Sequence, residues 1–134
     1  MAQLKVLAVL AMVWLASPAA FAHHPFADEF DRTQTVTLSG TVTRIDWQNP
    51  HVYAYVDVKD PAGKNASWKI EMGSPEALTR EGWTRTSVKA GDQITITVRP
   101  AKAGTPVGLI NRAQGVVVNG KQVLSGDRTA NAID

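Results

Sequence analysis

Apolar and polar residues alternate along several short segments of this chain, and glycine, proline or asparagine residues interrupt them. The segment His51–Val58 shows the pattern most clearly, because three valines and Ala54 occupy every second position while histidine, tyrosine and aspartate occupy the others. A period of two places the two sets of side chains on opposite faces of a β-strand. The sequence therefore predicts an all-β fold, with the apolar face of each strand in the core.

Five extended segments and one short helix are expected. The first strand, Val36–Trp47, changes phase after Val42 and contains Gly40, which predicts a β-bulge and a sharp bend. A helix from Pro75 to about Glu81 should separate the third and fourth strands, because a serine cap and a proline begin it and a glycine ends it. The other expected strands are His51–Val58, the segment around Trp68–Met72, Ile94–Val98 and Leu109–Val118, with a type I′ turn at Asn119-Gly120. This order predicts a five-stranded OB-fold-like Greek-key barrel, with an open β-sandwich as the alternative.

The N-terminal segment has the three parts of a secretory signal peptide. Lys5 precedes the apolar run Val6–Ala16, and Ala20 and Ala22 form an A-x-A cleavage site, so the mature chain is expected to begin at His23. The apolar run is shorter than the roughly 20 residues that a membrane-spanning helix needs, so no integral membrane segment is expected after cleavage. The expected organisation is a signal peptide (1–22), an N-terminal arm (23–34), the barrel (35–126) and a frayed tail (127–134).

Composition excludes several classes of function. The chain has no cysteine, which rules out disulfides and thiolate metal sites. Removal of Lys5 with the signal leaves 14 − 1 = 13 basic residues against 12 acidic residues, a net charge of +1 with the signs interspersed. Such a chain presents no broad basic face, so no nucleic-acid partner is expected.

The histidines His23, His24 and His51 are the candidate metal ligands. Cleavage after Ala22 gives His23 a free α-amine with a pKa of roughly 7.7 to 8.0, so a metal can displace its proton near neutral pH. That amine, the His23 imidazole and an opposing imidazole would form a T-shaped histidine brace, and near-planar nitrogen ligands favour Cu(II). His51 is the expected opposing ligand, since adjacent residues such as His23 and His24 rarely place their rings trans. The alternative is a solvated arm and a His51 that hydrogen-bonds a turn.

Aromatic residues form a second candidate site. Tyr53 and Tyr55 should lie beside His51 on the outward face of the second strand, a face from which OB barrels hold ligands. Together with Trp47 and Asn49 they are the candidate ligand-binding residues. The alternative interpretation is ordinary cross-strand packing. Two further tryptophans, Trp68 and Trp83, are assigned to the core.

Several motifs together resemble a family of small exported bacterial proteins of unknown function, the domain of unknown function 6152 type. The motifs that carry the resemblance are His23-His24-Pro25-Phe26, Trp47-Gln48-Asn49-Pro50-His51, Trp68-Lys69-Ile70-Glu71 and the helix from Ser74-Pro75 to Gly82-Trp83. The resemblance implies an exported, OB-like barrel of bacterial origin and no established activity. Pro25 stands where the family more usually has a small polar residue, which would stiffen the arm.

No nucleophile elbow, glycine-rich phosphate loop or metalloprotease helix occurs in the sequence. The leading hypothesis is a periplasmic or secreted, non-enzymatic binding module for a metal ion or small ligand, whose site combines the mature N-terminal arm with the outward face around His51. In one form of this hypothesis the module holds Cu(II), its only expected cofactor, through His23 and His51. One alternative is a structural domain that contacts an envelope protein and has no metal site. Another is a copper-dependent oxidase, which would need an open coordination position.

Overall fold

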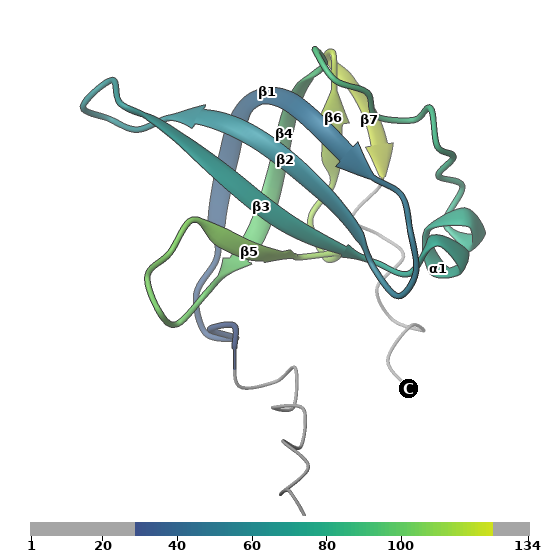
Figure 1. The fold of residues 1–134 in the computed structure, drawn as a ribbon, viewed down its shortest axis with the longest axis horizontal. Helices are drawn as coiled ribbons and strands as arrows, with labels where there is room; N and C mark the ends of the chain where they lie inside the picture. The colour runs from purple at the N-terminus through teal and green to yellow at the C-terminus, as the bar shows by residue number, and fades with distance from the viewer. Residues whose placement is uncertain (1–28, 125–134) are drawn as a thin grey trace, which may run out of the picture.

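The structure, a computed structural model, describes residues 29–124. Seven strands and one helix follow one another along this part of the chain (Figure 1). They are β1 (Val36–Asp46), β2 (Val52–Lys59), β3 (Asn65–Gly73), α1 (Pro75–Arg80), β4 (Gln93–Pro100), β5 (Val107–Ile110), β6 (Val116–Val118) and β7 (Lys121–Leu124). Within residues 29–124, no helix is long and apolar enough to cross a membrane.

Five of these strands close a barrel in the order β1-β2-β3-β5-β4, because β4 pairs with β1 as well as with β5. The pairing of β3 with β5 is parallel, whereas β1 with β2, β2 with β3, β4 with β5 and β1 with β4 are antiparallel. With α1 between β3 and β4, this arrangement confirms the predicted OB-like barrel.

The first strand is long enough to belong to both sides of the barrel. Its N-terminal half pairs with β4 and its C-terminal half pairs with β2, and at Gly40 the strand pairs with both. A side chain at Gly40 would overlap the main-chain oxygen of Asp57, so only glycine allows the two strands to approach this closely. The register shifts between Val42 and Arg44. The predicted bend and bulge of β1 are both confirmed.

The core fills the barrel with the alternate side chains that the sequence assigned to it. On β2 these are Val52, Ala54 and Val56, and β4 contributes its own isoleucines and valine from the opposite side. Burial of each such aliphatic side chain stabilises the fold by about 1.5 to 3 kcal/mol. Trp83 is buried in the same cluster, and Trp68 is partly buried against it.

Helix α1 begins and ends as the sequence indicates. The Ser74 hydroxyl accepts a hydrogen bond from the Ala77 amide at 3.1 Å, Pro75 occupies the first turn, and Gly82 has a φ of 93° just beyond the end. The Trp83 amide then donates to the carbonyl of Leu78 at 2.9 Å. This turn brings the Trp83 side chain into the core beside the buried face of the helix.

The prediction of a single strand over Leu109–Val118 is wrong. The Asn111 side chain is buried and accepts a hydrogen bond from the Ala113 amide at 3.2 Å, and its carbonyl accepts from Gln114. This local turn ends β5 and redirects the chain, because an asparagine side chain can take the place of a strand partner. The chain resumes as β6, which pairs with β4 and forms a hairpin with β7. The hairpin turn at Asn119-Gly120 has φ values of 50° and 79°, as a type I′ turn requires.

Part of the predicted N-terminal arm is packed against the barrel. Phe30 is buried and forms a β-bridge with Ala101. On either side of it, the Asp31 amide donates to the carbonyl of Pro100 and the Lys102 amide donates to the carbonyl of Glu29, both at 2.9 Å. The arm is therefore fixed to the barrel from Glu29 onward. The predicted signal peptide, His23, His24 and the tail 127–134 lie outside the described residues.

Candidate functional site

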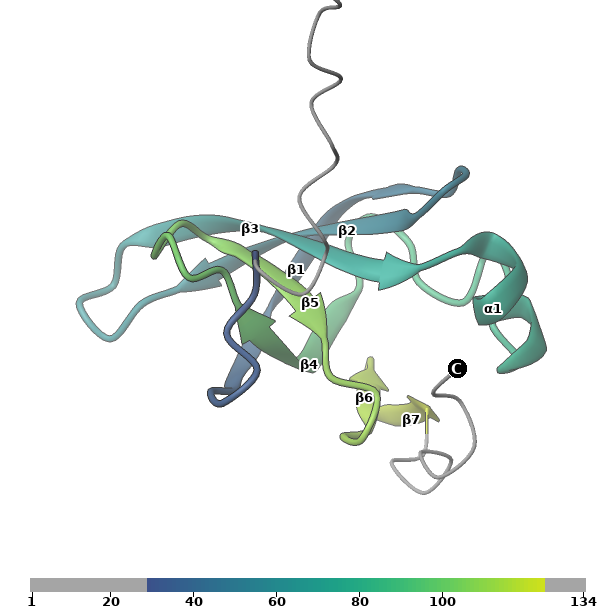
Figure 2. The same ribbon diagram turned by 90° about the horizontal axis from the view of Figure 1, so that it is seen from below.

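The outward faces of β2 and β3 form the candidate site. Figure 2 shows these two strands as one wall of the barrel, with β4 and the β6–β7 hairpin on the other side. The register aligns outward side chains in two rows across the wall. The first row is Asp46, Tyr53 and Glu71, and the second is Arg44, Tyr55 and Lys69. His51 lies just before β2, next to the first row, and its ring meets the Tyr53 ring edge-on with centroids 6.4 Å apart.

The closest polar contact of this site joins His51 and Glu71. Nδ1 of His51 lies 3.0 Å from Oε1 of Glu71. Glu71 is only 5% exposed, whereas the His51 side chain is 28% exposed. The Glu71 Oε1 atom is shielded from water, and the approach of the ring is short without being aligned as a full hydrogen bond. A buried carboxylate therefore faces one ring nitrogen of a partly exposed histidine.

Burial sets the protonation of this carboxyl group. Desolvation, followed by the nearby Glu29 carboxylate, raises the pKa of Glu71 to about 7, and the Lys69 ammonium lowers it by less. Desolvation likewise raises the pKa of Tyr53, with contributions from Glu71 and Glu29. Because its pKa is raised to about 7, the carboxyl group of Glu71 gains or loses its proton near neutral pH. Glu29, which the packed part of the arm fixes to the barrel, contributes to the raised pKa of both Glu71 and Tyr53.

Cations cover the two tyrosines. The guanidinium carbon of Arg44 lies 4.0 Å from the ring centroid of Tyr55, and Nζ of Lys69 lies 4.3 Å from that of Tyr53. Arg44 also forms an ion pair with Asp46 at 3.1 Å. Such cation–π contacts are worth about 0.5 to 1 kcal/mol at exposed positions. They hold the two aromatic rings in place, that of Tyr53 beside His51.

Comparison with known proteins places this chain in a family. A model of a family of unknown function, DUF6152, matches residues 11–112. The chain belongs to this family. The matched range includes β1 to β5 and the whole His51–Glu71 site, and it confirms the family resemblance seen in the sequence motifs. No curated protein matches the chain.

A solved structure is among those that match this chain. It is the crystal structure of the mitochondrial single-stranded DNA binding protein Rim1 from S. cerevisiae. The TM-score is 0.47 at 7% sequence identity, over 63% of this chain and 92% of that chain.

The other predicted ligand-binding residues of the DUF6152 protein lie at one end of β2. Trp47 is partly buried against the core, and its carbonyl accepts a hydrogen bond from Nη1 of Arg85 at 3.3 Å. Asn49 is exposed, and a cis peptide bond joins it to Pro50. The structure therefore brings Tyr53 to His51 and places Tyr55 in the next row of the same face, whereas Trp47 packs toward the core.

Glu71 is a central residue of the site, and the sequence assigned no role to it. Its motif was noted, but nothing along the chain indicates that it faces His51, which is 20 positions away. One feature of the chain could have indicated its role. Glu71 is an acidic residue between Ile70 and Met72, both of which are buried, whereas the other polar residues of β3 are exposed. A buried carboxyl group in such a place needs a partner.

Metal binding within the described part of the chain would be incomplete. Among residues 29–124, no three His, Asp or Glu side chains come together in a group that could hold a metal ion. The predicted ligands His23 and His24 lie outside the described residues, so their position relative to His51 stays a prediction.

Proposed function

We propose that this DUF6152 protein is an exported, non-enzymatic binding module that holds Cu(II) between His23, at the mature N-terminus, and His51. The observation that carries the proposal is the 3.0 Å approach of the buried Glu71 carboxylate to Nδ1 of His51. Metal-binding histidines commonly present one ring nitrogen to a carboxylate, which fixes the ring orientation and leaves the other nitrogen as the ligand. Glu71 would orient His51 in this way, with Nε2 as the ligand atom.

The length of the arm supports the pairing of His51 with the mature N-terminus. Glu29 is fixed to the barrel by the hydrogen bond from Lys102, and its charge acts on both Glu71 and Tyr53. Six peptide units separate Glu29 from His23, and such a segment spans at most about 20 Å. We infer that a segment of this length brings the α-amine of His23 to a site beside Glu71. His24 is the alternative ligand from the same segment.

The choice of metal rests on the ligand chemistry. An α-amine and two imidazoles supply three nitrogen ligands in a near-planar arrangement, which suits Cu(II) better than the harder cations. The chain has no cysteine to bind Cu(I) or zinc as a thiolate. Binding must displace the proton of the terminal amine, so affinity should rise with pH up to about 8.

The test is a Cu(II) titration of mature protein whose N-terminal residue has been verified by intact mass. Sub-micromolar binding and nitrogen hyperfine structure in the electron paramagnetic resonance spectrum are expected. His51→Gln, and separately one extra residue ahead of His23, should each weaken binding by about 100-fold or more, and Glu71→Gln by about 10-fold. Glu76→Gln, at an exposed carboxylate on α1, is the matched control and should leave the affinity unchanged.

Two other results would replace the proposal. Absence of sub-micromolar binding, or an affinity that neither His51→Gln nor the N-terminal extension changes, would favour a structural domain that contacts an envelope protein. Catalytic peroxide formation by the copper-loaded protein with ascorbate would instead favour a copper-dependent oxidase, because that chemistry needs an open coordination position.

A further inference from the structure

A second surface, at the opposite end of β2 from His51, carries mostly polar side chains in two rows across the sheet. The first row runs from β3 to β4 through Ser67, Asp57, Thr41 and Gln93. The second row lies two residues further along each strand. It contains the pair Asn65 and Lys59 and, across β1, the paired residues Ser39, Thr95 and Val117. Asp57 is six positions after His51, which corresponds to about 20 Å along an extended strand, so this surface is distinct from the candidate copper site.

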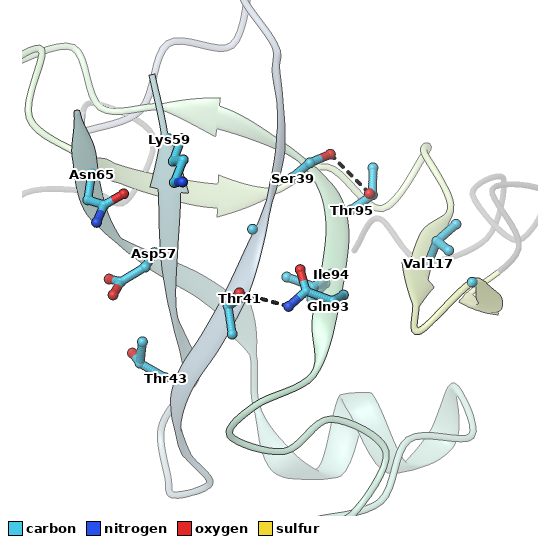
Figure 3. Close-up of a pocket in the computed structure, with 12 residues that line it drawn as sticks. Ser39, Thr41, Thr43, Asp57, Lys59, Asn65, Gln93, Ile94, Thr95 and Val117 are labelled. Atoms are coloured by element: carbon cyan, nitrogen blue, oxygen red, sulfur yellow. Dashed lines mark hydrogen bonds between the residues drawn. The ribbon is translucent and has the colours of Figure 1, made fainter. Parts of the chain in front are cut away.

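Three pairs of polar side chains in the two rows are ordered by hydrogen bonds between their members: Ser39 with Thr95, Thr41 with Gln93, and Ser67 with Asp57. The hydroxyls of Ser39 and Thr95 lie 3.0 Å apart, and Nε2 of Gln93 donates to the Thr41 hydroxyl at 2.8 Å (Figure 3). Each hydroxyl has one donor and two acceptor positions, so these bonds leave capacity for a ligand. These hydrogen-bonded side chains are therefore donors and acceptors that are already ordered before a ligand binds.

All the residues of these rows except Ser67 line a groove with a volume of about 690 Å³. In Figure 3, Ser39 and Thr41 on β1 lie between two sides: Asp57, Lys59 and Asn65 on one, and Gln93, Thr95 and Val117 on the other. Small-molecule sites in proteins commonly have volumes of about 300 to 1,000 Å³. The groove is therefore large enough for a ligand of a few linked rings.

The lining selects the chemistry of that ligand. Among the lining side chains, Asp57 carries a negative charge and Lys59 a positive charge, so the lining has no net positive charge with which to attract a polyanion. It contains no aromatic ring on which a base could stack. An apolar ligand would bury the hydroxyls without replacing their hydrogen bonds, which is unfavourable. A ligand rich in hydroxyl groups and free of charge satisfies all three conditions, and Val117 gives its C–H faces an apolar contact.

We propose that this groove binds a short, uncharged oligosaccharide across β1. The proposal is independent of the copper site, because it uses other residues at the other end of the strands. Hydroxyl groups of the sugar would exchange hydrogen bonds with Ser39, Thr41, Gln93 and Thr95, while Asn65 and Lys59 would contact the part of the ligand above the β2–β3 hairpin.

The test is a nuclear magnetic resonance titration of the ¹⁵N-labelled protein with maltotriose, cellotriose and triacetylchitotriose, each added separately. At least one of the three should give saturable shifts at the amides of Ser39, Thr41, Gln93 and Thr95, and leave the amide of Tyr53 unchanged. The double variant Ser39→Ala/Thr95→Val removes one hydroxyl pair and should weaken that binding by about tenfold or more.

A matched control exists one row away on the same two strands. Thr37 and Thr97 form an equivalent hydroxyl pair at 2.9 Å but do not line the groove. The variant Thr37→Val/Thr97→Val should retain the wild-type affinity, and urea unfolding will show whether both double variants stay folded. Absence of saturable shifts with all three sugars, shifts centred on another face, or equal loss of affinity in both variants would overturn the proposal.

Discussion

Replacement of Glu71 by glutamine should remove a pH dependence from the stability of the metal-free protein. The pKa of Glu71 is about 7 in the folded protein, against an ordinary value of 4.5. The folded state therefore binds this proton more tightly than the unfolded chain does. The stabilisation that results is complete below about pH 4.5 and is lost as the pH rises through about 7.

The size of the effect follows from the two pKa values. Their difference, 7 − 4.5 = 2.5, corresponds to about 3 kcal/mol at about 1.4 kcal/mol per pH unit. Two factors reduce this value. The His51 side chain is partly exposed, so solvent near it screens the Glu71 charge, and the His51 ring, 3.0 Å from the carboxyl group, interacts favourably with ionised Glu71. We therefore expect about 2 kcal/mol of the stability to be lost between about pH 5 and about pH 8.

Urea unfolding at a series of pH values, with a chelator present, measures this loss directly. Glu71→Gln mimics the protonated carboxyl group, so it should match the wild type at low pH and be about 2 kcal/mol more stable at about pH 8. Glu76→Gln, whose parent side chain is 80% exposed, should follow the wild type throughout. Equal pH dependence in the wild type and Glu71→Gln would refute the assignment of a raised pKa to burial.

Three further substitutions test the fold. Ile96→Asp places an unpaired charge at a fully buried position of β4 and should cost about 4 kcal/mol or more; an unchanged melting temperature would contradict the inward phase of that strand. Gly40→Ala should lower the free energy of unfolding in urea by about 2 to 3 kcal/mol, because the new Cβ would overlap β2. The control Gly63→Ala, at a position in open space with a φ of 81°, should lower it by about 1 kcal/mol. Equal losses would argue against the close approach of β1 and β2 at Gly40. Arg112→Met removes the 2.6 Å ion pair with the mostly buried carboxylate of Glu81 and should lower the free energy of unfolding by about 2 kcal/mol. The control Arg80→Met removes the exposed ion pair with Glu76 and should change it by less than about 0.5 kcal/mol. Similar losses from both would show that burial of the ion pair does not determine its contribution.

Local patterns were sufficient to predict most of the barrel. The alternation in β2 and β4, the phase change in β1 and the cap of α1 each involve residues within a few positions of one another, and each was confirmed. The error over Leu109–Val118 has a different origin. Apolar residues continue through this segment, and the pattern alone does not reveal that the Asn111 side chain turns back on its own main chain to end β5.

The candidate site shows the same division. Alternation along β2 predicted that Tyr53 and Tyr55 point outward with His51, because successive side chains of a strand point to opposite faces of the sheet. The contact of His51 with Glu71 depends instead on how β2 aligns with β3. A register shift between Val52 and Tyr53 contributes to that alignment, and it cannot be read from either strand separately.

The sequence by itself determined the elements, the inward and outward faces of the strands, and the motifs of the family. Tertiary structure decided which outward residues became neighbours: His51 with the buried Glu71, the arm at Glu29 with the same site, and Thr41 with Gln93 across the polar groove. The physical reason is that periodicity acts within a segment of a few residues. Register and barrel closure, by contrast, depend on turns, bulges and packing that join strands far apart in the chain.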